Sequence, residues 1–349
     1  MKVRKMVAAV ACCVAAYLPS CSVAQTAATS PLSTLRLEMR ADYDHKYLMP
    51  SAADNSFMYG FVGRYFNLHA GGDIADGFSY YFRQRVIADN GRHGFFDNTD
   101  FLYLNYRATD NWSFRFGKDA LAVGGFEYDA PPIDVYFNGN YWDQFYCFQL
   151  GASAAYTFDD GRQSLRLQVA NSPDLHSDVA SSPSNYLSYN LLWSGNFGHF
   201  QTLYSASLFE RRDGGYLSYV ALGNRWVYDD WSLYVDLMHH GSQEDWLGYL
   251  GFVTRADVKL NADLSLFAKG GYEWTSYDNG TFAWDFLSLP CRDYLFGGFG
   301  VEYRPAFCRD IRLHAFLAAS NLYGDKTLTA NVGATWNVNF ARLFKFNNQ

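Results

Sequence analysis

The sequence predicts an all-β fold, namely a single transmembrane antiparallel β-barrel of about sixteen strands. Three observations predict it. Segments of roughly 9 to 14 residues alternate apolar and polar side chains. The connections between these segments are short and long in turn. Aromatic residues make up 19% of the chain although its mean hydropathy is only −0.20, which is typical of aromatic girdles around a barrel with a polar interior.

The amino terminus has the pattern of a secretory signal peptide. Lys2, Arg4 and Lys5 precede an apolar run from Met6 to Leu18, and small residues follow it. We expect a signal peptide over residues 1–24 and one barrel domain over residues 25–349. Lipoprotein cleavage before Cys21 is the competing interpretation.

The remainder of the chain excludes several classes of protein. No later apolar run has the roughly 18 to 20 residues of a membrane helix, so a membrane form must be a barrel. Three of the six cysteines lie in the expected signal peptide, and Cys147, Cys291 and Cys308 have no metal-binding or disulfide spacing. The expected mature chain has 28 − 3 = 25 basic and 35 acidic residues, or a net charge of −10. We therefore expect no metal, no cofactor and no nucleic-acid partner.

Alternation defines sixteen candidate strands. In one of them Leu165, Leu167 and Val169 share a face, while Arg166 and Gln168 occupy the other. A β-sandwich would alternate as well, but its strands are commonly shorter, near five or six residues. The candidate strands are 35–43, 57–70, 77–88, 99–108, 111–119, 144–158, 162–171, 185–194, 197–209, 216–227, 231–240, 250–260, 263–274, 293–303, 310–319 and 327–340.

The connections alternate in length, as they do in outer-membrane barrels. Short turns rich in Asp, Asn and Gly would face the periplasm, and long loops would face the outside. The short turns are 108–111, 159–161, 194–198, 228–230 and 261–263, and the long connections are 44–56, 89–98, 120–143, 172–184, 241–249 and 275–292. The last candidate strand would close the barrel in the outer membrane of a Gram-negative bacterium.

A sixteen-stranded barrel is wide enough for water, so its inward polar face is the candidate functional surface. Five arginines would lie near mid-height on one wall and form a pore-lining basic patch: Arg40, Arg83, Arg85, Arg115 and Arg166. The faces of Arg64 and Arg225 stay unassigned. The alternative for each inward arginine is pairing with an inward acid, for which the candidates are Glu38, Asp42, Asp236, Asp257, Glu273 and Glu302.

The longest connection, from Ala120 to Gln144, is the candidate constriction loop after strand 5. Loops in this ordinal position fold into the lumen of sixteen-stranded general porins and narrow it. Gly124 and Gly125 would permit a sharp inward turn, and two prolines would stiffen the span. Its acids would face the basic wall and create a transverse field. The candidate residues are Gly124, Gly125, Phe126, Glu127, Tyr128, Asp129 and Asp134.

Three segments carry a resemblance to a known family. They are AspAsnThrAspPheLeuTyrLeuAsnTyrArg at 97–107, AsnTrpSerPheArgPheGlyLys at 111–118 and LeuAlaValGlyGlyPheGluTyrAsp at 121–129. In these segments the chain resembles the phosphate-selective porin O and P family. The resemblance implies a trimeric sixteen-stranded porin that passes small anions. The family's phosphate selectivity depends on pore surfaces rich in Lys and Arg, whereas no Lys or Arg lies between Asp119 and Gln144.

The expected function is passive diffusion of small hydrophilic solutes, phosphate or other small anions among them. The expected partners are outer-membrane lipids, these solutes and two further copies in a homotrimer. An enzyme is not expected, because Ser205, Ser207, His239, His240 and His314 show no arrangement of nucleophile and base. The alternative from another class is a surface-structural or adhesin-type barrel with a plugged lumen.

Overall fold

The computed structural model describes most of the chain after the expected signal peptide. The described residues are 30–49, 56–86, 96–143, 145–173, 185–211, 214–243, 245–276, 293–321 and 326–340. The predicted signal peptide, Cys21, Cys291 and most of the connection 275–292 lie outside these residues. In the described part of the chain, no helix has both the length and the apolar character needed to cross a membrane.

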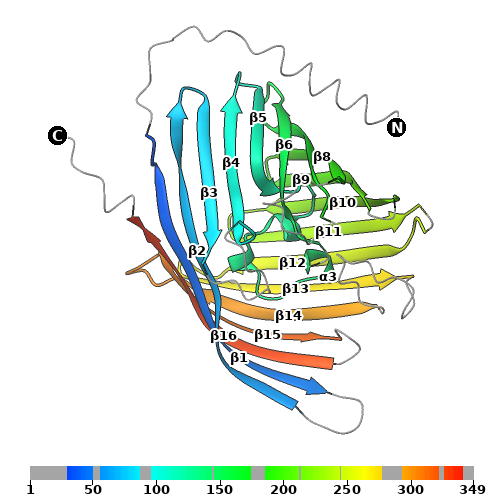
Figure 1. Ribbon diagram of the computed structural model, residues 1–349. Coiled ribbons are helices and arrows are strands. Elements are labelled where there is room, and N and C mark those ends of the chain that lie inside the picture. Colours follow the sequence, from blue (N-terminus) through cyan, green and yellow to red (C-terminus); the bar gives the residue numbers. More distant parts are fainter. Residues whose placement is uncertain are drawn as a thin grey trace, which may run out of the picture.

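Sixteen antiparallel strands form a closed barrel in which each strand pairs with its neighbours in sequence (Figure 1). The predicted barrel is therefore confirmed. The strands are β1 Thr34–Met49, β2 Ser56–Ala75, β3 Phe78–Arg85, β4 Thr99–Arg107, β5 Trp112–Ala120, β6 Phe148–Thr157, β7 Gln163–Asn171, β8 Leu187–Phe197, β9 Phe200–Glu210, β10 Tyr216–Val227, β11 Trp231–Ser242, β12 Tyr249–Lys259, β13 Leu264–Thr275, β14 Tyr294–Tyr303, β15 Ile311–Ser320 and β16 Lys326–Asn339.

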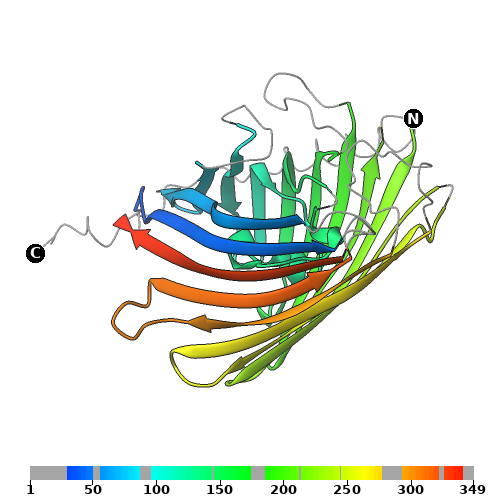
Figure 2. The ribbon, with the colours of Figure 1, turned by 90° about the horizontal axis from the view of Figure 1, so that it is seen from below.

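The first and last strands close the barrel, as the alternation of the final segment predicts. β1 and β16 pair from Arg36 opposite Asn339 to Met49 opposite Lys326, and Figure 2 shows them side by side. Several bounds differ from the sequence-based ones by three residues or more; β1 ends at Met49 rather than at residue 43, and β2 ends at Ala75 rather than at residue 70. β6 begins at Phe148 rather than at residue 144, and β8 runs to Phe197, so that its turn to β9 is only Gly198 and His199.

Side chains alternate across the barrel wall. Leu102 and Leu104 of β4 and Phe299 and Leu295 of β14 are exposed on the outer face, where lipid replaces water around an outer-membrane barrel. The opposite face of the same wall carries buried charged and polar side chains such as Glu302. This alternation is that of a barrel with an apolar exterior and a polar interior.

The connection from β5 to β6 carries the helices of the described chain. They are α2 Phe126–Asp129, the 3₁₀ helix η1 Pro132–Asp134 and α3 Asn140–Asp143. We call residues 121–147 the inner segment, because their contacts below are with inward side chains of the wall. Figure 1 shows α3 within the outline of the barrel. The main apolar core of the molecule forms where this segment packs against β7, β9, β10, β11, β12 and β14.

Candidate pore lining and constriction segment

The inner segment leaves the wall at a fixed point. The side chain of Gln168 on β7 donates to the carbonyl oxygen of Ala120 at 3.0 Å and accepts from the amide of Ala122 at 2.7 Å. The amide of Leu121 donates to the carbonyl of Cys147 at 2.8 Å, which joins the two ends of the segment. An inward glutamine thus satisfies the backbone where the pairing of β5 ends.

Two glycines let the segment pass close to the wall. The amide of Gly124 donates to Oγ of Ser205 on β9 at 2.7 Å. Gly125 has a φ of 95°, which favours glycine. A Cβ on Gly223 of β10 would lie only 2.9 Å from the Cα of Gly125. Small inward residues on β9 and β10 therefore provide the space in which the backbone crosses.

Asp236 of β11 anchors the start of α2. Its carboxylate accepts hydrogen bonds from the amides of Phe126 at 2.9 Å and Glu127 at 2.7 Å. The first amides of a helix have no partner within the helix, and a carboxylate there satisfies them. Asp236 is completely buried, so this contact fixes the segment to the wall away from water.

The next anchor is an ion pair with β13. Nζ of Lys269 lies 2.6 Å from Oε1 of Glu127 and donates to the carbonyl of Phe137 at 2.7 Å. Glu127 also accepts from the amide of Gly139 at 2.8 Å. The amide of Tyr141 donates to Glu273, also of β13, at 3.3 Å. Two charged side chains of β13 thus hold α2 and the turn before α3.

The far end of the span reaches β14, β15 and β1. Asp134 pairs with Arg312 of β15 at 2.6 Å. Arg40 of β1 donates to the carbonyls of Ile133 at 3.2 Å and Val135 at 2.9 Å. The hydroxyl of Tyr136 donates to Glu302 of β14 at 2.9 Å, and burial raises the pKa of this phenol so that it stays a donor.

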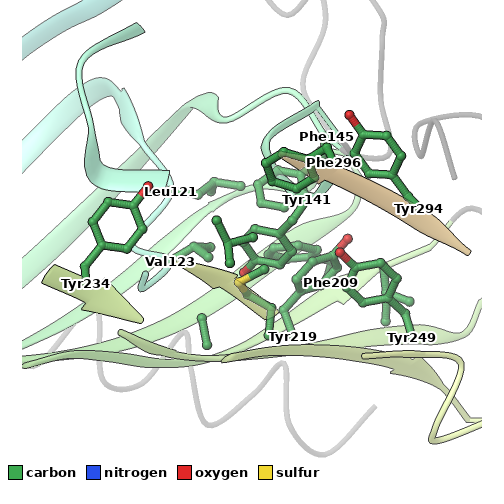
Figure 3. Packing of buried hydrophobic residues seen from close by; sticks show 14 of the residues in the cluster. Leu121, Val123, Tyr141, Phe145, Phe209, Tyr219, Tyr234, Tyr249, Tyr294 and Phe296 are labelled. Atoms are coloured by element: carbon green, nitrogen blue, oxygen red, sulfur yellow. The ribbon is translucent and has the colours of Figure 1, made fainter. Parts of the chain in front are cut away.

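Aromatic packing fills the space beneath the returning chain. Phe145 packs edge-on against Phe209 of β9 and Tyr219 of β10, with ring centroids 5.3 and 5.2 Å apart. Tyr141 lies 5.7 Å from Tyr219, and Figure 3 shows these rings packed together. Tyr141, Phe209 and Tyr219 are fully buried. The inner segment and the inward faces of β9 and β10 are therefore closely packed here.

The five patch arginines lie in three groups, each paired with an aspartate. Arg40 pairs with Asp42 at 2.7 Å. Arg83 and Arg85 share Asp100, at 2.9 and 2.8 Å. Arg115 and Arg166 share Asp119, at 2.7 and 2.5 Å. The structure thus gives each of them an acidic partner, as the alternative interpretation of single arginines expects, and five arginines less three aspartates leave a formal excess of two positive charges.

Exposure separates the two signs of charge along the wall from β1 to β7. The side chain of Arg115 is 31% exposed, whereas that of Asp119 is 7% exposed. Arg64 of β2 is 33% exposed above Asp42, which is 0% exposed. In these pairs the guanidinium groups are therefore exposed to water while their carboxylates are buried. Arg40 and Arg83 are the buried members of the patch.

Two β-bulges direct charged residues inward. Along β1 and β2, Arg40 pairs with Tyr65 and Ala41 with Gly63, so Arg64 is the extra residue, and it contacts Asp42 and Asp44. Along β3 and β4 the register skips Asp100, which contacts Arg83 and Arg85. A bulge redirects a side chain across the sheet. Strict alternation therefore cannot assign the side chain of Arg64 to a face of the barrel wall. The side chain of Arg225 points inward, because its guanidinium lies over Phe126, 5.8 Å from the ring centroid.

The acids of the inner segment contact cations other than the patch arginines. Glu127 and Asp134 pair with Lys269 and Arg312, on β13 and β15. We expected the acids of this loop to face the patch arginines, but these two acids pair with Lys269 and Arg312 instead. Asp129, the third acid whose side chain is described, is exposed. The constricting role of the segment stays a prediction.

Three residues that anchor the inner segment, Gln168, Ser205 and Gly223, are not identified as its partners from the sequence. Their inward parity could have marked them as candidates, since each lies on the face opposite exposed apolar neighbours. His314 lies 3.1 Å from Asp42, and His239 bonds to the carbonyl of Trp246, so these two histidines make separate contacts. The described residues include no group of three or more His, Cys, Asp or Glu side chains that could hold a metal ion.

A closed barrel of sixteen antiparallel strands, with an apolar exterior and a charged interior, defines the class of outer-membrane porins. The family model for phosphate-selective porin O and P matches residues 34–212, which is 179 of the 349 residues. The chain belongs to this family and is an outer-membrane porin, so the predicted family and location are confirmed. No curated protein matches it.

Solved porin structures share the fold. The outer-membrane channel DcaP of Acinetobacter baumannii is similar with a TM-score of 0.59 at 12% identity, over 87% of this chain and 96% of that chain. An anion-selective porin from Comamonas acidovorans gives 0.58 at 12% identity, over 86% and 98%. OmpT of Vibrio cholerae, in its trimer form, gives 0.57 at 13% identity, over 87% and 99%. At these low sequence identities, the similarity shows that the fold is shared and nothing more.

Proposed function

We propose that this porin forms a passive, water-filled channel for small hydrophilic solutes with a preference for anions. The observation that carries the proposal is the wall from β1 to β7, where exposed guanidinium groups lie above buried carboxylates. Arg36, Arg64, Arg85, Arg115 and Arg166 are 38%, 33%, 21%, 31% and 20% exposed. Charged side chains that line a pore set its ion preference.

The opposite half of the interior supports a solute path along that wall. There the inner segment buries the cations of its anchors, so that Lys269 is 4% and Arg312 11% exposed. The exposed charges on that half include the acids Asp134 and Asp257, at 40% and 35% exposure, so the exposed guanidinium groups of β1 to β7 supply the basic side of the path. The inner segment would thus narrow the lumen without neutralising the accessible wall.

A planar bilayer tests both parts of the proposal. Folded protein is expected to produce stepwise conductance. In a salt gradient, the sign of the reversal potential is expected to show that anions permeate better than cations. The variant Arg85→Gln, Arg115→Gln, Arg166→Gln should shift that potential toward the cation side. Arg309→Gln is the matched control, because Arg309 pairs with Asp263 at a short turn and is 47% exposed. Absence of conductance would contradict a channel, and an unmoved potential would contradict the role of the wall.

The close packing of the inner segment against the wall favours a second candidate function, a surface-structural or adhesin-type barrel with a plugged lumen. Tyr141, Phe145, Phe209 and Tyr219 form a core like that of a soluble domain. A barrel that folds and inserts but passes no current would support this candidate.

We also propose removal of residues 1–24 as a signal peptide, a single barrel domain over 25–349, assembly as a homotrimer and no enzymatic activity. Amino-terminal sequencing and cross-linking of the membrane form test the first and third of these.

A further inference from the structure

One cluster on the accessible wall combines charge with an aromatic surface. Arg115, Asp119 and Arg166 lie just below the point where the inner segment leaves β5, because Asp119 directly precedes Ala120. A solute that passes the inner segment on the accessible side therefore meets this cluster.

The cluster keeps unused hydrogen-bond donors. Arg115 donates from Nη1 to Asp119, and Arg166 donates from Nη2 to the same oxygen and from Nε to Ser153. Nε and Nη2 of Arg115 and Nη1 of Arg166 make no hydrogen bond within the described residues. Two arginines and one aspartate leave a formal charge of +1. The bonded nitrogens lie 2.7 and 2.5 Å from one carboxylate oxygen, so they are at most 2.7 + 2.5 = 5.2 Å apart.

The guanidinium of Arg115 lies over an aromatic ring. Its central carbon is 4.1 Å from the ring centroid of Tyr103 on β4. Gly117 lies between Arg115 and Asp119 on the inward face of β5 and opposite Tyr103. A Cβ there would overlap the carbonyl oxygen of Leu102 and lie 2.7 Å from the Cα of Tyr103, so the close approach of β4 to β5 beside Arg115 requires glycine. The side chain of Arg115 is 31% exposed, so part of the guanidinium is accessible from the lumen.

A second ring continues the surface beside this stack. Tyr81 of β3 has its centroid 5.8 Å from that of Tyr103, and both rings are half-buried on the lumen side. Guanidinium groups are weakly hydrated and stack on planar groups. An aromatic body can therefore lie on Arg115 while an attached carboxylate accepts from Arg166.

Inorganic phosphate suits this surface less well. It is strongly hydrated and carries up to two charges near neutral pH, so many donors must replace its water. Here the formal charge is +1, and tyrosine rings occupy the neighbouring positions. The cluster matches a weakly hydrated organic anion with a single charge.

We propose that Arg115, Arg166 and Tyr103 form a binding subsite for small aromatic monocarboxylates, with Arg166 donating to the carboxylate and the accessible part of the Arg115 guanidinium stacking on the ring. This inference rests on the proposed anion channel and names its preferred solute class. The subsite binds weakly, since a solute that is to cross the pore must also leave.

Block of the chloride current in planar bilayers tests the subsite, with benzoate, acetate and inorganic phosphate as probes. Benzoate is expected to reach half-block at a concentration about tenfold lower than acetate or phosphate. Tyr103→Leu should raise the half-block concentration of benzoate by about three- to tenfold, the size of a partly desolvated cation–π contact, and change that of acetate less than twofold. Arg166→Gln should weaken block by both carboxylates.

Tyr303→Leu is the matched control, because Tyr303 is an exposed barrel tyrosine on the outer face and should leave every half-block concentration unchanged. A channel that conducts chloride but is blocked equally by benzoate and phosphate, or equally in wild type and Tyr103→Leu, would overturn the subsite while the channel stands. Equilibrium dialysis of labelled benzoate against the folded barrel in detergent tests the subsite even without conductance. No difference there between wild type and Tyr103→Leu would likewise overturn it.

Discussion

Lys269 of β13 and Glu127 of α2 form an ion pair of 2.6 Å in which both side chains are buried, at 4% and 1% exposure. They belong to the wall and to the inner segment, so this pair joins the two parts of the molecule. A buried charge whose partner is removed is left without compensation, which costs about 3 to 5 kcal/mol. The pair therefore contributes to holding the inner segment on β13, together with the contacts of Phe137 and Tyr141.

The first prediction is that Glu127→Gln or Lys269→Met releases the inner segment while the barrel stays folded. Sixteen strands pair independently of this contact, so heat-modified mobility on gels should remain. Single-channel current should become noisier, and added protease should cleave the inner segment faster. Lys259→Met, at an exposed lysine whose Nζ donates to the carbonyl oxygen of Asp229, should change neither property.

The double variant Glu127→Gln, Lys269→Met sharpens the test. Removing both charges leaves no uncompensated ion, so its protease sensitivity should be lower than that of either single variant. Additive effects of the two substitutions would show that the ion pair is not what holds the segment.

The second prediction concerns the close passage of Gly124 beneath β9. A Cβ at this position would lie 2.6 Å from the carbonyl oxygen of Leu203 and 3.0 Å from the amide nitrogen of Ser205. These are backbone atoms of a paired strand and cannot move aside. Gly124→Ala should thus destabilise the docked segment by about 1 to 3 kcal/mol, the usual cost of overpacking, measured as the same rise in protease cleavage and current noise.

Gly297→Ala is the control for Gly124→Ala. A Cβ on Gly297 would meet its nearest neighbours at 3.7 and 3.9 Å, an ordinary contact distance. If both alanine variants behave like wild type, the segment does not depend on the space at Gly124.

The barrel could be predicted from the sequence because alternation is a local property. Leu165 and Arg166 differ in face whatever the rest of the chain does, and the same rule repeated along the chain gives the strands. The ordinal position of the inner segment follows from counting those strands. Its contacts do not follow, since Phe126 meets Asp236 across 110 residues of sequence, and only the path of the loop across the lumen brings them together.

The charged pairs show a second reason. Arg64 and Asp100 are extra residues at β-bulges, where the period of two is interrupted. A single extra residue reverses the face of a side chain, and the sequence carries no mark of either bulge. Arg64 therefore stays unassigned in the sequence, and the role of Asp100 as the partner of Arg83 and Arg85 is missed.

The third prediction uses the cysteines as reporters of the segment's burial. Burial raises the pKa of the Cys147 thiol to about 11, well above the usual value of about 8.5. At pH 8 only about one thiol in a thousand is then the reactive thiolate, against about a quarter at the usual pKa. Maleimide should modify Cys147 slowly, about tenfold faster for each unit of pH up to about pH 11.

Cys308, in the short turn between β14 and β15, is the internal comparison. In a Cys291→Ser background, a Cys308→Ser variant isolates Cys147 and a Cys147→Ser variant isolates Cys308. Equal modification rates of the two thiols at pH 8 would show that the end of the inner segment is open to water. Faster labelling of Cys147 after Lys269→Met would connect this reporter to the ion pair.

The last prediction concerns Asp119, which is 7% exposed beneath two guanidinium groups. Asp119→Asn removes the one carboxylate that Arg115 and Arg166 share, so the formal charge of the cluster rises from +1 to +2. The anion preference measured from the reversal potential should increase. The increase should be largest near 0.01 M salt, where screening extends over about 30 Å, and small at 1 M, where it extends over about 3 Å. Asp263→Asn removes a carboxylate of the same kind from Arg309 at the barrel end, 2.6 Å away, and should leave the potential unchanged. A decrease in anion preference in Asp119→Asn would mean that the aspartate acts by holding the arginines in place rather than by offsetting their charge.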